Sequence, residues 1–402
     1  MPVADAKMVP FAPKYLRVGE ALPFGVHDAQ GQLLLAAGQV IESQDRLIKL
    51  TSQALTVEEE ASFDWRRRLV VTMDAMVRQN ASLKQIAEAR PKDEAEAIRA
   101  IAETPLNDQW EDAIAALDAA LRDARPDGAW LMRALDLRVQ CHRLATRRPD
   151  ASLYYQIWRA AQAPQRYSAQ HSLLVQLVVE LAAPLLGIGA EGVERLGEAA
   201  LMMNVAMVRL QDHLAQNNLP PTPAQRKEIA EHAELGARML RACGVDDSVC
   251  RIVALHHHDS LPADVDPVIA LQTQLLHRID VFTAKLSRRK TREPMSPVQA
   301  ARQACLGADG KPDAIGSALL KALGLYPPGS FVQLASGEQG VVVSRGRSPS
   351  QPLVASLISA SGMPMGEPTL RDTGDARFLV KAPVASSTMK VRPIHAKVLA
   401  LI

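Results

Sequence analysis

The sequence has few residues of several kinds, and each shortage excludes a class of protein. Only 4 of its 402 residues are cysteines, and none stands in a Cys-x-x-Cys pair, so neither a disulfide scaffold nor a zinc-finger array is predicted. Cys243 and Cys250 are close in sequence, but small buried thiols in a reducing cytoplasm are the better interpretation. Aromatic residues make up only 4% of the chain, which argues against a stacking surface for single-stranded nucleic acid.

Charge and apolar runs are equally limited. The formal net charge of +2 gives no electrostatic reason to expect binding to nucleic acid or to an anionic membrane. Residues Met1 to Tyr15 have no continuous apolar core of the signal-peptide type. The most apolar run, Leu173 to Ile188, is interrupted by Glu180 and Pro184 and is too short to cross a bilayer. We therefore expect a soluble cytoplasmic protein that binds neither nucleic acid nor membrane.

The length and patterning predict a mainly α-helical protein with a small β module at each end. At about 150 residues per domain, 402 residues suggest two or three domains, and 48% hydrophobic residues suffice for a sizeable core. We expect a β-rich module at residues 1–57, a helical region at 58–163, a dense helical domain at 164–325 and a β module at 326–402.

Local signals place several of the expected elements. A hairpin is predicted over Leu22 to Gly38, and Ser43 is a natural cap for the short helix after it. Thr222 and Gln225 form a predicted capping box, and Gly324 is expected to close the last helix of the dense block. The other helices of that block are predicted at Ala169–Leu186, Glu191–Leu210, Asp246–His258 and Pro267–Arg289.

Four histidines and one aspartate within this helical block are the candidate functional residues. His171 and Asp280 interrupt very apolar segments, and His232 lies in an amphipathic one. His257 and His258 belong to a run of three histidines at an expected helix end. Singly, each has an ordinary structural explanation, such as a core histidine or an ion pair for Asp280. Together they have the residue types and order of a metal-dependent phosphohydrolase.

The arrangement resembles the HD-GYP family of bacterial cyclic di-GMP phosphodiesterases, a branch of the HD metal-dependent phosphohydrolases. The resemblance covers about residues 167–324 and is carried by Tyr167–Ser172, Glu231–Gly236, His257–Asp259 and Asp280–Ala284. It also extends into the tail at Tyr326–Val332. It implies an HD-like helical bundle. The metal ligands that it implies are His171, His232, His257, His258 and Asp280.

The departures from the family pattern concern its catalytic centre. The resemblance places Met203 and Asn204 at the positions of the His-Asp pair, and Met207 at the position of a lysine that would steady a phosphate. The GYP signature is reduced to Asp259–Pro262. Because methionine and a neutral amide cannot replace imidazole and carboxylate as ligands of hard cations, we expect no catalytic residues here. No cofactor is expected, apart from a weakly held Fe, Mn or Zn ion at the remaining donors.

The function expected from these observations is that of a pseudoenzyme. The resemblance implies a catalytically degenerate regulatory or scaffolding component of bacterial cyclic di-GMP signal transduction, with a protein partner or self-association. One alternative is a metal-dependent phosphodiesterase with residual or altered activity. The other is an effector that binds cyclic di-GMP or another nucleotide without cleaving it. For that case Arg288 and Arg292 are candidates for phosphate contact, although a solvated helix end is the better explanation of these residues.

Overall fold

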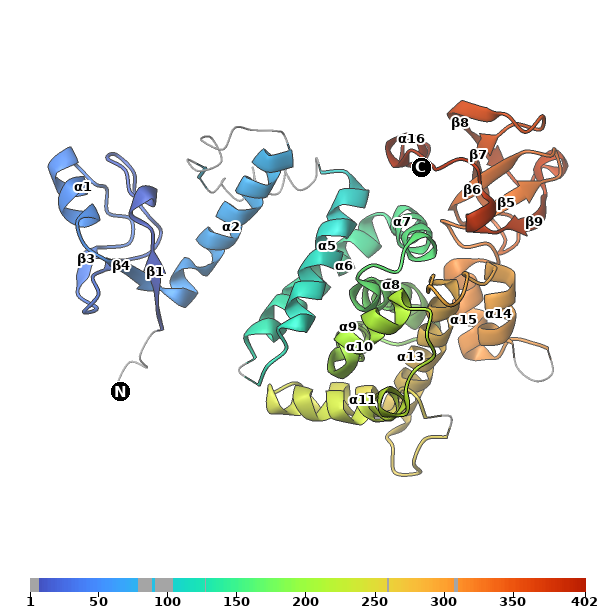
Figure 1. Cartoon of the computed structure of the whole chain (residues 1–402), viewed down its shortest axis with the longest axis horizontal. Coiled ribbons are helices and arrows are strands. Elements are labelled where there is room, and N and C mark those ends of the chain that lie inside the picture. Colours follow the sequence, from blue (N-terminus) through green and yellow to red (C-terminus); the bar gives the residue numbers. More distant parts are fainter. Residues whose placement is uncertain (1–6, 79–88, 91–103, 127, 259, 307–309) are drawn as a thin grey trace. The chain divides into compact units, whose positions relative to one another are not determined.

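The computed structural model describes residues 7–78, 89–90, 104–126, 128–258, 260–306 and 310–402. Its chain divides into two compact units, Met1–Thr104 and Pro105–Ile402 (Figure 1). The predicted fold class is confirmed, because helices dominate and each end of the chain carries a small antiparallel sheet. The boundary between the units falls inside the helical region expected at residues 58–163, so that region does not form one unit.

Among the described residues, the first unit contains a small sheet and the helices α1 and α2. Its strands pair in the order β1-β4-β2-β3, all antiparallel. Their bounds are β1 Met8–Phe11, β2 Val26–His27, β3 Leu33–Leu35 and β4 Leu55–Glu58. The expected hairpin is thus β2-β3. Helix α1 (Gln44–Thr51) begins as predicted, with the Ser43 side chain accepting from the Arg46 N–H, and α2 (Glu59–Arg78) follows β4.

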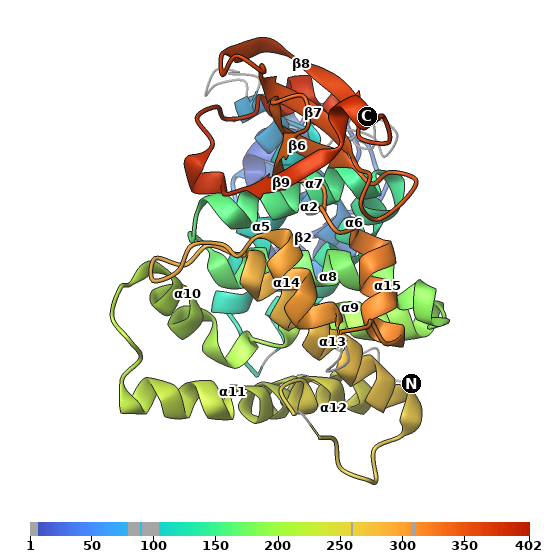
Figure 2. The same cartoon turned by 90° about the vertical axis from the view of Figure 1, so that its right-hand side faces the viewer.

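The second unit is a helical bundle that begins at Leu106. Its helices are α5 Leu106–Arg122, α6 Ala129–Arg147, α7 Pro149–Gln162, α8 Tyr167–Ala182, α9 Ala190–Met202, α10 Val208–Gln216, α11 Pro223–Ala242, α12 Asp247–Leu255, α13 Pro267–Leu286, α14 Pro297–Cys305 and α15 Ala314–Leu323. The predicted caps are present: Thr222 and Gln225 form a complete capping box, and Gly324 ends α15 with a φ of +77°. Figure 2 shows α11 and α12 along one side of the bundle.

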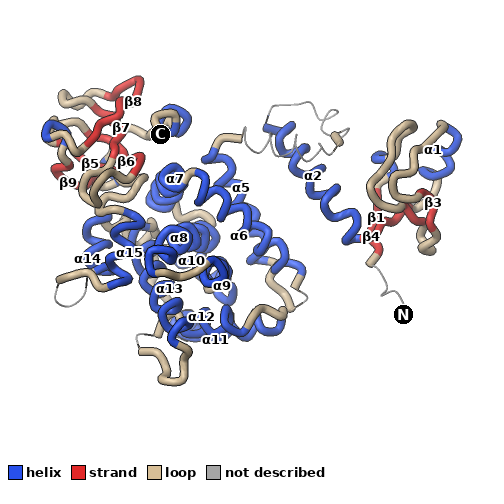
Figure 3. The backbone as a smooth tube through the Cα atoms, turned by 180° about the vertical axis from the view of Figure 1, so that it is seen from behind, coloured by secondary structure: helices blue, strands red, loops and turns tan. Residues whose placement is uncertain are grey.

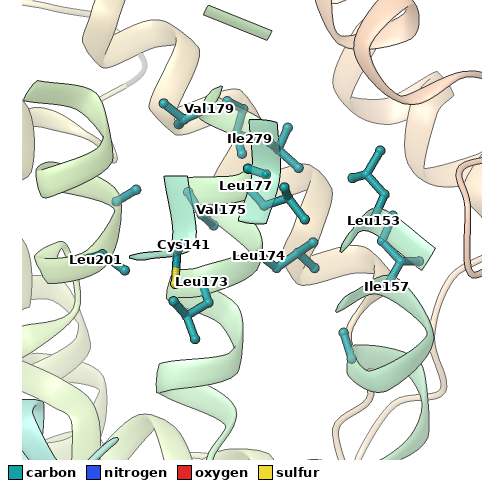
Figure 4. Packing of buried hydrophobic residues seen from close by; sticks show 14 of the residues in the cluster. Cys141, Leu153, Ile157, Leu173, Leu174, Val175, Leu177, Val179, Leu201 and Ile279 are labelled. Carbon is teal, nitrogen blue, oxygen red and sulfur yellow. The ribbon is translucent and has the colours of Figure 1, made fainter. Parts of the chain in front are cut away.

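Helix α8 is the centre of this bundle. Every residue of the helix except Leu181 is buried, which is the pattern of a helix that is surrounded by others. It contacts α5, α6, α7, α9, α10, α13 and α15 (Figure 3). Leu173, Leu174 and Val175 lie among apolar side chains of neighbouring helices, including Ile279 of α13 (Figure 4).

The membrane expectation needs one correction. The sequence predicts that the run Leu173 to Ile188 is too short to cross a bilayer. The helical segment Tyr167–Leu186, however, has 20 residues and is long and apolar enough to do so by length and composition. In the fold, 78% of its most apolar window is buried inside the bundle. Its apolar character is therefore explained by its place in the core.

The helix expected at Glu191–Leu210 is also wrong as a single element. Helix α9 ends at Met202, a short 3-10 turn follows at Val205–Met207, and α10 starts at Val208. Asn204 stands at the break, where its carbonyl accepts from the Met207 N–H at 2.9 Å. Asparagine favours such breaks because its side chain competes with the helical backbone for hydrogen bonds.

The C-terminal module is a five-stranded antiparallel sheet in the order β8-β7-β6-β5-β9. Its strands are β5 Phe331–Leu334, β6 Gln339–Ser344, β7 Leu353–Ile358, β8 Pro364–Asp372 and β9 Val380–Val384. Strand β8 and the final helix α16 (His395–Leu399) had no clear sequence signal. The sheet is tied to α7 through Asp150, which accepts from the Ser344 hydroxyl at 2.9 Å and from Arg345 Nε at 2.5 Å.

His395 anchors the end of the chain to helix α7. Its ring lies against those of Trp158, Tyr155 and Tyr154, with centroid distances of 4.3, 5.2 and 5.7 Å. Its Nδ1 is 2.9 Å from the Tyr154 hydroxyl. Burial lowers the pKa of His395, an effect that the negative charges of Asp108 and Glu111 partly oppose.

We predict that His395 makes the stability of the second unit fall in mild acid. A histidine whose pKa is lowered in the folded state binds fewer protons there than in the unfolded chain. Stability is therefore lost as pH falls below about 6.5, by at most about 1.4 kcal/mol per pH unit. The free energy of unfolding from urea titrations, measured with a chelator at about pH 6.5 and 4.5, should depend less on pH in His395→Phe. Equal pH dependence in the variant and the parent would contradict the prediction.

Candidate functional site

The predicted site residues converge on one cavity in the helical bundle. His171 of α8, His232 of α11 and Asp280 of α13 line it, together with His257 and His258, which follow α12. The cavity has a volume of about 820 Å³. Five residues that are spread over 110 positions of the sequence thus share one space, as the resemblance implied.

Three histidines form a tight cluster within this space. One ring nitrogen from each of His232, His256 and His257 lies within 4.8 Å of the others. His232 and His256 are buried, and His257 is exposed. The cluster contains His256, which is not among the metal ligands that the resemblance implies, and it does not contain His258. Helix α12 ends at Leu255, and that point decides which members of the histidine run face inward.

Hydrogen bonds fix the tautomers of the two buried rings. His232 Nδ1 is 2.6 Å from the Ile229 carbonyl oxygen, and His256 Nδ1 is 2.6 Å from that of Val253. Because a carbonyl only accepts, each Nδ1 must carry the proton. Each neutral ring then has its lone pair on Nε2, and both Nε2 atoms are buried without a hydrogen-bond partner in the described part of the chain.

The protonation state of these rings suits metal binding. Burial lowers the pKa of His232. Burial, with the neighbouring charge of His257, lowers the pKa of His256 to about 3. Both rings are therefore neutral near pH 7, the form in which imidazole binds metal. A buried lone pair whose ring is held by a carbonyl on its other side is the usual arrangement of a metal-binding histidine. The cluster thus fits a divalent ion.

His171 and Asp280 are engaged with each other. His171 Nε2 lies 2.6 Å from Asp280 Oδ1, and since a carboxylate accepts, Nε2 carries the proton. Burial would raise the pKa of Asp280, but the hydrogen bond from His171 and the potential of the nearby histidines hold that pKa well below its usual range. Asp280 is therefore ionised, and it brings a negative charge into the cavity.

A tyrosine and an arginine extend this pair. The ring of Tyr167 is stacked on that of His171, with centroids 5.7 Å apart and an interplanar angle of 15°. Arg289 lies over the same tyrosine at 5.0 Å and donates to its hydroxyl at 2.8 and 3.1 Å. Arg289 also lines the cavity, so it brings a positive charge to the wall.

The two arginines predicted to contact phosphate, Arg288 and Arg292, are engaged with other groups. Arg288 pairs with Glu293 at 2.8 Å, and Arg292 donates to the Ala284 carbonyl at 2.7 Å. Neither is among the described residues that line the cavity, whereas Arg289 is. Helix α13 ends at Leu286, and the chain beyond it is not helical, so helical spacing could not show which arginine faces inward.

The positions of the family's His-Asp pair are occupied as the sequence indicated. Asn204 is 2% exposed and lines the cavity. Met207 also lines it, whereas Met203 is completely buried and is absent from the described lining residues. The pair thus contributes the Asn204 amide to the cavity wall, and Met207 contributes a thioether. Neither group carries the negative charge that would hold two cations together.

Comparisons with known proteins agree with this site. Residues 168–297 match the model of the HD domain family. Over 254 residues the chain is 28% identical to the cyclic di-GMP phosphodiesterase PA4108 of Pseudomonas aeruginosa, with 61% of each protein covered. The chain therefore matches less than two thirds of that relative's length.

A solved structure is also similar in part. The protein Bd1817, an HDG"Y"P protein from Bdellovibrio bacteriovorus, is 14% identical, with a TM-score of 0.33 over 78% of this chain and 99% of that one. The HD match covers the segment that supplies His171, His232, the histidine run and Asp280. With the sequence relative and the helical architecture, this match supports an HD-GYP-type domain in this chain.

Proposed function

We propose that this protein acts in bacterial cyclic di-GMP signalling as a regulatory or scaffolding component that does not hydrolyse the nucleotide. The observation that carries the proposal is Asn204 on the cavity wall, where the resemblance to the family puts a carboxylate. The relative PA4108 is a cyclic di-GMP phosphodiesterase, which supports the signalling context. A cytoplasmic location follows from the same context, because that is where we expect the nucleotide.

The proposed loss of hydrolytic activity follows from the charges of the residues at the cavity. A two-metal hydrolase needs groups that hold both cations close together and orient the attacking water between them. Asn204 is neutral, and Met203 is buried beside it without facing the cavity. Of the carboxylates that line the cavity, Asp280 is already engaged by His171 at 2.6 Å, and Glu234 is exposed. These residues favour at most one ion.

His232, His256 and His257 are the residues that would hold that ion. Three imidazoles match a tetrahedral zinc site with one open position, and imidazole also binds Mn and Fe. When bound, such an ion supplies Lewis acidity and lowers the pKa of a bound water. The protein contributes the fixed tautomers of His232 and His256, through the carbonyls of Ile229 and Val253.

A matched pair of neighbouring histidines tests the metal site. His257 and His258 are both exposed and both line the cavity, but only His257 belongs to the cluster. We predict about one zinc per chain by metal analysis, weakened about tenfold or more in His257→Gln and unchanged in His258→Gln. A larger loss in His258→Gln than in His257→Gln would show that the run binds in the other register, and equal losses would contradict the assignment to His257 alone.

Turnover is predicted to be absent. With manganese or iron added, cyclic di-GMP should disappear no faster than in a protein-free blank, because no carboxylate joins a second ion to the first. Metal-dependent hydrolysis that is lost in His257→Gln would instead support the phosphodiesterase alternative. The variant Met203→His/Asn204→Asp restores the family's pair and should bind Mn²⁺ more tightly than the parent. The change Asn218→Asp, at an exposed position, serves as its control.

A second candidate function, nucleotide binding without cleavage, is favoured by the cavity itself. Its volume of about 820 Å³ lies within the range of about 300–1,000 Å³ for sites that enclose small organic ligands. Arg289 offers a guanidinium on its wall, held by Tyr167. A guanidinium binds phosphate with two parallel hydrogen bonds.

This candidate predicts that cyclic di-GMP binding depends on Arg289. In calorimetry with the full chain, Arg289→Gln should weaken binding about tenfold or more, since it removes a charged contact. Arg288→Gln is the control, because Arg288 faces Glu293 and does not line the cavity. Absence of binding in the parent protein would leave the scaffolding role, which size-exclusion chromatography and pull-down with cyclase domains then test.

A further inference from the structure

A small basic cleft lies at the junction between helix α15 and the C-terminal sheet. It has a volume of about 190 Å³ and is formed by the end of α15 and by the loop between β6 and β7. Figure 1 shows α15 next to the C-terminal sheet. The cleft shares no lining residue with the histidine cavity. We propose that this cleft binds a phosphate group, either free phosphate or the phosphate of a small nucleotide.

The charge of the cleft supports this assignment. Its lining includes Lys321, Arg345 and Arg347, and contains no aspartate or glutamate among the described residues. Arg345 is neutralised by Asp150 at 2.5 Å. Lys321 and Arg347 are exposed, and neither makes an ion pair within the described ranges. The cleft therefore presents two uncompensated positive charges, Lys321 and Arg347, which attract a multiply charged anion.

The cleft is also held in shape before any ligand arrives. Arg345 donates to the Ala322 carbonyl at the end of α15 at 2.9 Å, and the Leu325 N–H donates to the Pro349 carbonyl at 2.7 Å. Gly346 is required at the bend, because a Cβ there would lie 1.6 Å from the Gln351 carbonyl oxygen. These ties close the loop onto the helix, so a ligand does not have to order it.

The lining chemistry selects phosphate. Guanidinium and ammonium groups, which the lining provides, form strong charge-assisted hydrogen bonds with phosphate oxygens. The negative end of the α15 dipole opposes an anion, but Arg345 and the Gly324 N–H already occupy the carbonyls of Ala322 and Leu320. A volume of about 190 Å³ is below that of sites for whole drug-sized molecules, about 300–1,000 Å³, so the cleft encloses one anionic group.

The experiment uses the full chain in a buffer free of phosphate and sulfate. Inorganic phosphate, pyrophosphate and guanosine 5′-monophosphate are titrated separately by calorimetry, and guanosine without phosphate serves as the ligand control. We expect the phosphates to bind with millimolar or tighter affinity, guanosine not to bind, and added salt to weaken binding. Tighter binding of the nucleotide than of inorganic phosphate identifies a nucleotide as the source, and equal binding identifies free phosphate.

Matched variants assign the binding to the cleft. Lys321→Gln/Arg347→Gln should weaken phosphate binding about tenfold or more. The control, Arg302→Gln/Lys381→Gln, removes the same charge from exposed positions outside the cleft and should bind like the parent. Both cleft residues are exposed, so the change should leave the fold intact, which thermal unfolding checks.

Two results would overturn the proposal. One is an absence of phosphate binding up to about 10 mM. The other is an equal loss in the cleft variant and the charge control. The proposal stands apart from the function of the histidine cavity, because His257→Gln and Arg289→Gln should leave phosphate binding at the cleft unchanged.

Discussion

The burial of helix α8 on all sides is the constraint on which the second unit depends. A polar side chain inside a helical bundle is costly unless a neighbour satisfies it, and several polar groups of α8 donate to particular partners on the neighbouring helices. Gln170 Nε2 donates to the Gln156 side chain of α7 at 2.7 Å, and Gln176 Nε2 donates to the Arg138 carbonyl of α6 at 3.1 Å. The polar groups of α8 therefore set the register of the helices around it.

The pair of His171 and Asp280 belongs to the same set of ties, since it joins α8 to α13 at 2.6 Å. It is a structural contact whether or not a metal is present, because separating the two would leave a buried carboxylate unpaired. Met203 and Asn204, where the resemblance places the family's His-Asp pair, lie by contrast at the turn after α9. The tie between α8 and α13 therefore does not depend on these two positions.

Structural features that depend on a few neighbouring residues could be predicted from the sequence. The directions in which side chains point at the ends of helices could not. The capping box at Thr222 depends only on residues three apart, so the sequence contains all that determines it. Successive residues of a helix point about 100° apart, so the choice between His256 and His258 depends on where α12 ends. The same holds after α13, where Arg289 faces the cavity and Arg288 does not. Tertiary packing decides these cases.

Burial of the histidine cluster costs free energy that packing alone does not offset. The Nε2 atoms of His232 and His256 are buried without partners among the described residues, and each such atom costs about 1–3 kcal/mol. Apolar side chains of similar size would avoid that cost. Met203, the residue before Asn204, is such a side chain and is completely buried. An ion that accepts both lone pairs would offset it, and the tautomers are already set for such an ion by the carbonyls behind each ring. This cost favours a cluster that binds a ligand over one that only fills space.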